Sequence, residues 1–126
     1  MQLATARLDG RTTAVGVDQE RGLVELARLR EPLPPSVLGV LGSVSPEEFS
    51  ARIAAEPDGS FRPVDDTAFL APYLAPGKIW GIGLNYTEHA DDLAAGYPDE
   101  PGSFMKGDHT IIGPGETIDQ PRRASA

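Results

Sequence analysis

The segment from Lys78 to Leu84 is almost entirely apolar, with glycines at positions 81 and 83, and it restricts the possible folds more than any other part of the chain. A short continuous apolar run of this kind is typical of a β-strand that is covered on both faces. Such a strand needs pairing partners, because unpaired buried backbone groups are costly. The segment therefore predicts a buried strand within a larger sheet.

Three further strands are predicted before residue 30. Residues 2–8, 12–17 and 23–26 show partial alternation of apolar and polar residues. Asp9-Gly10, between the first two segments, is a hairpin turn signal, and residues 18–22 form a polar turn before the third. The beginning of the chain therefore reads as an antiparallel meander.

A helix is predicted over residues 46–55. Ser45 suits the N-cap, the proline after it suits the first helical position, and Glu48 completes the pattern of a capping box. Phe49 and Ile53 lie four positions apart, so they share one helix face. We expect that face to pack against the meander.

Proline and glycine divide the rest of the chain into short elements, with 14 glycines and 12 prolines among 126 residues. The prolines of residues 32–35 end the meander, and residues 57–66 are interpreted as a linker. A helix is expected over residues 88–95, and short strands over 104–106 and 110–112. Together these elements predict an α+β fold that is rich in strand.

Composition excludes several classes of function. The net charge of −8 argues against a nucleic-acid partner, because phosphate binding needs clustered Lys and Arg. The chain has no cysteine, which excludes disulfides, thiol catalysis and Cys-ligated metals. No apolar run has the length of a membrane span and no signal peptide is visible, so a cytoplasmic location is expected.

The residue pair with catalytic chemistry is His89 and Asp92. At a spacing of three on a helix they share a face, and a carboxylate partner fixes the imidazole proton and stabilises its cation. Such a pair can act as a general base towards water. By spacing alone, a solvated surface pair is the commoner explanation.

Four ordered motifs resemble the fumarylacetoacetate hydrolase family, and above all its bacterial branch of hydroxyhepta-dienedioate isomerases and acylpyruvate hydrolases. They are the run from Pro76 to His89, Glu100-Pro101, Phe104-Met105-Lys106 and residues 112–115. Residues 1–60 resemble the small N-terminal domain of that branch. Residues 61–126 resemble the beginning of its catalytic domain, which the family folds as a mixed β-roll.

The resemblance implies a dimeric enzyme that uses Mg²⁺ or Mn²⁺ and acts on 2-oxo acids by hydrolysis, isomerisation or decarboxylation, as in aromatic catabolism. It makes His89 and Asp92 the dyad that activates water or moves protons, although the family commonly has Glu at position 92. Lys106, Asn85 and Tyr86 correspond to residues that contact the substrate. For Lys106, a solvent-exposed lysine at a strand end is an equally good interpretation.

The family's metal ligands, a Glu-x-Glu pair and a later Asp, are not matched in this chain, so we expect no metal ligand among its residues. Glu116 and Asp119 are interpreted as turn residues, and Asp108-His109 as a polar loop. We expect the second half to be poorly stable alone, or to be completed by a second copy or another chain. The alternative functions are a non-catalytic interaction module built on the N-terminal domain and, less favoured, an unrelated domain.

Overall fold

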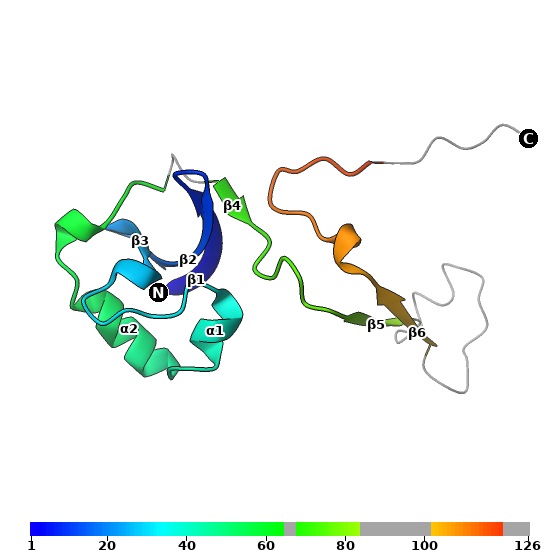
Figure 1. The fold of residues 1–126 in the computed structure, drawn as a ribbon, viewed down its shortest axis with the longest axis horizontal. Coiled ribbons are helices and arrows are strands. Elements are labelled where there is room, and N and C mark those ends of the chain that lie inside the picture. The colour runs from blue at the N-terminus through cyan, green and yellow to red at the C-terminus, as the bar shows by residue number, and fades with distance from the viewer. Residues whose placement is uncertain (65–67, 84–101, 120–126) are drawn as a thin grey trace, which may run out of the picture. The chain divides into compact units, whose positions relative to one another are not determined.

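The fold is α+β and rich in strand (Figure 1). It was analysed in a computed structural model that describes residues 1–64, 68–83 and 102–119. The chain divides into two compact units, one of residues 1–73 with 112–126 and the other of residues 74–111. No helix within the described residues is both long and apolar enough to cross a membrane.

The first unit is built on a four-stranded antiparallel sheet with the order β3-β2-β1-β4 (Figure 1). The predicted meander is confirmed, with the hairpin turn at Asp9 and Gly10, whose φ angles of 50° and 77° are those of a tight two-residue turn. The edge strand β4 was not predicted. The strands are β1 Gln2–Leu8, β2 Arg11–Asp18, β3 Gly22–Glu25 and β4 Ala68–Leu70.

One face of this sheet carries the larger hydrophobic core. The 3₁₀ helix η1 Leu26–Arg28 and the helices α1 Val37–Leu41 and α2 Pro46–Ala54 pack there. Gly16 of β2 lies directly under Ile53 of α2, and a methyl group at Gly16 would overlap the Ile53 Cδ1 atom. The absence of a side chain at this position therefore sets how closely α2 approaches the sheet.

The predicted N-terminus of α2 is confirmed, because the Ser45 Oγ accepts a hydrogen bond from the Glu48 N–H at 3.2 Å. Phe49 and Ile53 are both buried, as their spacing predicts. The Glu48 carboxylate does not complete a capping box: it pairs with Arg52, one turn further along the helix, at 2.5 Å. An opposite charge four residues away is a better partner than a neutral backbone amide.

The other face of the sheet carries a second core, formed by Ala6, Leu8, Val15 and Leu23. The backbone of Arg62 lies beside β3, where it exchanges two hydrogen bonds with Leu23 at 2.8 and 2.9 Å. Residues 58–62, which the sequence indicated as part of a linker, therefore belong to the packed unit. The 3₁₀ helix η2 Asp58–Ser60 precedes this contact.

The second unit is an antiparallel pair, β5 Ile79–Gly83 and β6 Gly102–Lys106, followed by the 3₁₀ helix η3 Asp108–Thr110. The prediction that β5 is covered on both faces is wrong for this chain, because Trp80 and Ile82 are 67% and 64% exposed. Within the described residues its only strand neighbour is β6. Its side chains alternate between half-buried and exposed, because consecutive residues of a strand point to opposite faces.

The strand predicted over residues 110–112 is also wrong. Thr110 ends η3 instead, and both its N–H and its hydroxyl donate to the carbonyl of Gly107, at 3.0 and 2.8 Å. A side-chain hydroxyl that binds the backbone three residues earlier stabilises a turn at the expense of an extended strand.

Candidate functional site

The site residues predicted from the sequence fall between positions 85 and 106 of the chain. Asn85, Tyr86, His89 and Asp92 lie outside the described residues. Lys106 is described, and it is the last residue of β6. In the sequence, Asn85 follows the end of β5 by two positions, so the predicted site begins where this strand ends.

The register of β5 and β6 determines which side chains accompany Lys106. Ile79 pairs with Lys106, and Gly81 pairs with Phe104. Because side chains alternate along a strand, these four residues share one face of the ladder. The opposite face carries Trp80, Ile82, Ser103 and Met105.

The Lys106 ammonium group has an aromatic neighbour. Its Nζ atom lies 5.6 Å from the centre of the Phe104 ring, within the range of a cation–π interaction. Within the described residues Lys106 forms no ion pair with a carboxylate. Since the side chain is exposed, its charge is accessible to an anionic ligand.

Three polar residues that follow β6, Asp108, His109 and Glu116, lie in a short 3₁₀ helix or a turn. Asp108 and His109 lie in the exposed 3₁₀ helix η3. The Glu116 carboxylate accepts a hydrogen bond from the Gly113 N–H at 2.7 Å, which confirms its interpretation as a turn residue. Among residues 1–64, 68–83 and 102–119, no three His, Asp or Glu side chains come together to hold a metal ion. The described residues therefore do not fit the Mg²⁺ or Mn²⁺ that the family resemblance implies.

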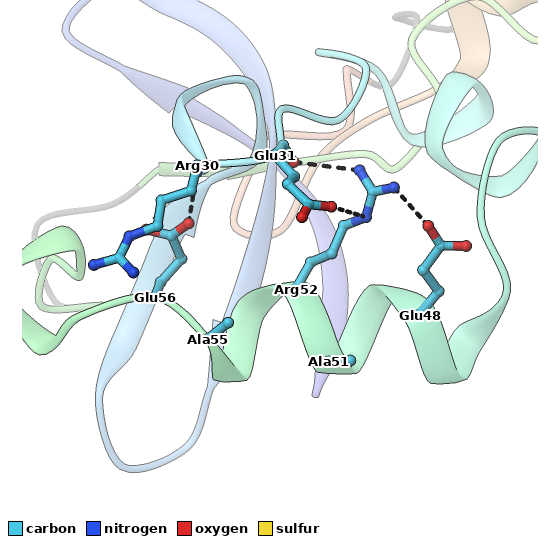
Figure 2. Close-up of a pocket in the computed structure, with 7 residues that line it drawn as sticks. All are labelled: Arg30, Glu31, Glu48, Ala51, Arg52, Ala55 and Glu56. Atoms are coloured by element: carbon cyan, nitrogen blue, oxygen red, sulfur yellow. Dashed lines mark hydrogen bonds and ion pairs between the residues drawn. The ribbon is translucent and has the colours of Figure 1, made fainter.

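The first unit contains a pocket of about 440 Å³ between α2 and residues 30–31 (Figure 2). Figure 2 shows Arg52 between Glu48 and Glu31, with its Nε atom 3.7 Å from a Glu31 carboxylate oxygen. The buried Glu56 carboxylate accepts a hydrogen bond from the Arg30 N–H at 2.6 Å. Arg52 and Glu56 thus hold the loop onto the helix, and the pocket contains none of the predicted site residues.

Two carboxyl groups among the described residues have lowered pKa values because they accept hydrogen bonds at a turn or at a helix end. Hydrogen bonds from the Arg21 and Glu20 N–H groups lower the pKa of Asp18 at the turn between β2 and β3. Hydrogen bonds to its own backbone N–H and to Ser45 lower the pKa of Glu47 at the start of α2. Each group stabilises a turn or a helix end, and none lies on the ladder that carries Lys106.

The chain was compared with known proteins. Residues 78–126 match the family described as fumarylacetoacetate (FAA) hydrolase C-terminal. A fumarylacetoacetate hydrolase domain-containing protein 2 homolog of Dictyostelium discoideum is 32% identical over 109 residues, which are 85% of this chain and 35% of that protein. The mitochondrial oxaloacetate tautomerase Fahd2a of Rattus norvegicus is 30% identical over 97 residues, which are 77% of this chain and 31% of that protein.

An uncharacterized protein of Archaeoglobus fulgidus is 40% identical over 65 residues, which are 52% of this chain and 26% of that protein. The chain therefore spans about a third or less of the length of these relatives. These similarities agree with the resemblance at the level of the superfamily. They do not single out the isomerase and acylpyruvate hydrolase branch.

Proposed function

We propose, on the basis of the fumarylacetoacetate hydrolase superfamily membership that these similarities support, that this chain is part of an enzyme acting on 2-oxo acids. The observation that carries the proposal is the position of the family match. Residues 78–126 hold every site residue predicted from the sequence, from Asn85 to Lys106. The reaction classes considered are tautomerisation or isomerisation, hydrolysis of a carbon–carbon bond, and decarboxylation.

Lys106 is proposed to bind the carboxylate of the 2-oxo acid. An ammonium group donates charge-assisted hydrogen bonds to a carboxylate, and these are stronger than bonds between neutral groups. The chain carries a net charge of −8, which repels anions over long range. A local cation is therefore needed to hold an anionic substrate, and Lys106 is exposed at the end of the ladder.

His89 and Asp92 are proposed as the proton-transfer pair, on the sequence spacing alone. In tautomerisation, His89 accepts a proton from the carbon beside the oxo group, and the oxo oxygen gains a proton as the enol forms. In hydrolysis, His89 accepts a proton from water as the water oxygen attacks the carbonyl carbon. The carbon–carbon bond then breaks, its electron pair stays on the leaving enolate carbon, and that carbon takes the proton back from His89. Asp92 stabilises the resulting imidazolium in both cases.

The dependence on Mg²⁺ or Mn²⁺ and dimer formation stay predictions from the family, and the cytoplasmic location stays a prediction from the sequence. The described residues supply no metal site, so none of the steps above is assigned to a metal ion. Adding each cation in increasing concentration to an activity assay with a 2-oxo acid substrate tests this dependence.

The alternative function is a non-catalytic interaction module. It is favoured by the organisation of the first unit, where both hydrophobic cores lie within residues 3–69 and involve no predicted site residue. An interaction module needs neither turnover nor substrate binding. Catalysis and its absence therefore separate the two functions.

The proposed function is tested by following the keto–enol interconversion of oxaloacetate and the cleavage of an acylpyruvate with the chain as it stands. His89→Ala and Asp92→Asn should lower kcat strongly, and Lys106→Met should raise KM. The chain has two histidines, so His109→Ala is the matched control and should keep full activity. No turnover with any of these substrates, together with no binding of pyruvate, would reject catalysis by this chain alone and favour the interaction module.

A further inference from the structure

We propose that Gly81 and Phe104 are positioning residues for Lys106. Because Gly81 has no side chain, the Phe104 ring can pack directly on its backbone. The ring in turn restrains the Lys106 ammonium group. The ligand that Lys106 binds rests on the proposed function. The positioning itself rests only on contacts within the β5–β6 ladder.

The contact between Gly81 and Phe104 is unusually close. The two residues are paired across the ladder, and the ring lies over the glycine where a side chain would otherwise stand. A methyl group at Gly81 would overlap the Phe104 Cζ atom and come within 2.7 Å of Cε1. Overlap with an aromatic ring forces the ring to move, so glycine is required here if the ring is to keep its place.

Gly83 provides the comparison on the same strand and the same face. Among the described residues, a methyl group there would meet only the Phe104 Cδ1 atom, at 4.0 Å, which is an ordinary van der Waals contact. Neither Gly81 nor Gly83 has a positive φ angle. Alanine is therefore compatible with the backbone at both positions, and the two substitutions differ in their effect on the ring.

The ring in turn restrains Lys106. Phe104 and Lys106 are two positions apart on β6, so their side chains point to the same face. The ammonium group lies 5.6 Å from the ring centre, although a lysine side chain has four rotatable bonds and many alternatives in solvent. A lysine side chain that is already restrained before a ligand arrives loses less conformational entropy when it binds an anion.

The first measurement is nuclear magnetic resonance of the lysine side chains. The chain has only two lysines, Lys106 and Lys78, so each serves as a reference for the other. The ε-protons of Lys106 should be shifted upfield by the Phe104 ring relative to those of Lys78. The shift should be lost in Gly81→Ala and Phe104→Leu and kept in Gly83→Ala and Phe104→Tyr.

The second measurement is the affinity for pyruvate as a minimal 2-oxo acid. Loss of an exposed cation–π contact should weaken binding by about 2- to 5-fold in Gly81→Ala and Phe104→Leu. Phe104→Tyr should restore the native affinity, and Gly83→Ala should not change it. Gly81→Ala should add nothing to the loss caused by Lys106→Met, because both changes remove the same interaction.

The two measurements separate the failure of this proposal from the failure of the proposed function. If the ε-protons of Lys106 are shifted upfield but Lys106→Met does not change the affinity for pyruvate, the positioning of Lys106 by Phe104 is supported. The proposed role of Lys106 in binding the substrate is then rejected. The absence of any shift in the unsubstituted chain overturns the positioning, and this observation needs no variant to fold. A shift that survives Gly81→Ala in a folded chain overturns the role of the glycine.

Discussion

The guanidinium group of Arg62 binds both carboxylate oxygens of Asp9, at 3.3 and 3.0 Å, across 53 positions of sequence. The pair joins the turn between β1 and β2 to the segment that lies beside β3. Both side chains are substantially exposed, so the ion pair by itself contributes little to stability. The measurable effect of the ion pair is on the pKa of Asp9.

The first prediction concerns the titration of Asp9. The hydrogen bond and charge of Arg62 hold the pKa of Asp9 below its ordinary value of 3.8. A lowered pKa means that the stabilising contribution is present above pH 3.8 and is lost as the pH falls through the folded-state pKa. Asp9→Asn should therefore lower the unfolding midpoint only slightly at neutral pH and leave it unchanged at strongly acid pH.

The carboxyl carbon resonance of Asp9, followed against pH, measures this pKa directly. Arg62→Gln should return the pKa towards 3.8. Arg62→Lys should return it only in part, because the charge remains and the two-point contact is lost. An unchanged titration in Arg62→Gln would contradict the assignment.

The second prediction concerns the close approach of Gly16 and Ile53. Gly16→Ala should destabilise the chain by about 1–3 kcal/mol, because the new methyl group overlaps Ile53 Cδ1 in a filled core. Ile53→Val removes that atom, so the double variant should lose less stability than the sum of the two single variants. Urea unfolding of all four chains measures the coupling, and strict additivity would argue against the overlap.

The third prediction concerns the N-cap of α2. Ser45→Ala should cost about 0.5–2 kcal/mol in urea unfolding, because the Glu48 N–H loses its acceptor. Ser45→Asp keeps an acceptor at the same position and should remain close to the original stability. Equal losses in the two variants would show that the hydroxyl is not acting as a cap.

The fourth prediction uses the single tryptophan of the chain. Trp80 is 67% exposed on β5, so its fluorescence emission should be that of a solvated indole and should be quenched efficiently by acrylamide. Emission at short wavelength with weak quenching, at a dilution where the chain is monomeric, would show that this face of β5 is covered after all. A blue shift that grows with protein concentration would indicate association through the face.

Local signals in the sequence predict much of the first unit. The turn at Asp9-Gly10 and the cap at Ser45 depend on hydrogen bonds and backbone angles within a few residues, so strands β1 to β3 and helix α2 were predicted close to their observed bounds. Helix α1 was missed because its five residues, with Gly39 among them, are too few to show a periodicity. The family resemblance, and not periodicity, indicated the site residues.

The tertiary structure decided what depends on residues far apart in the chain. Thr5 pairs with Leu70 in β4, and Leu23 bonds to Arg62, although nothing local marks these partners. The exposure of β5 depends on what packs on the β5–β6 ladder, and the contact between Phe104 and Gly81 depends on the register of the two strands. Neither feature can be predicted from the residues of one strand alone. The sequence by itself determined the approximate bounds of β1 to β3 and of α2, because the signals that mark them are local interactions. Pairing, burial and the surroundings of Lys106 are contacts across the chain, and only the folded structure defines them.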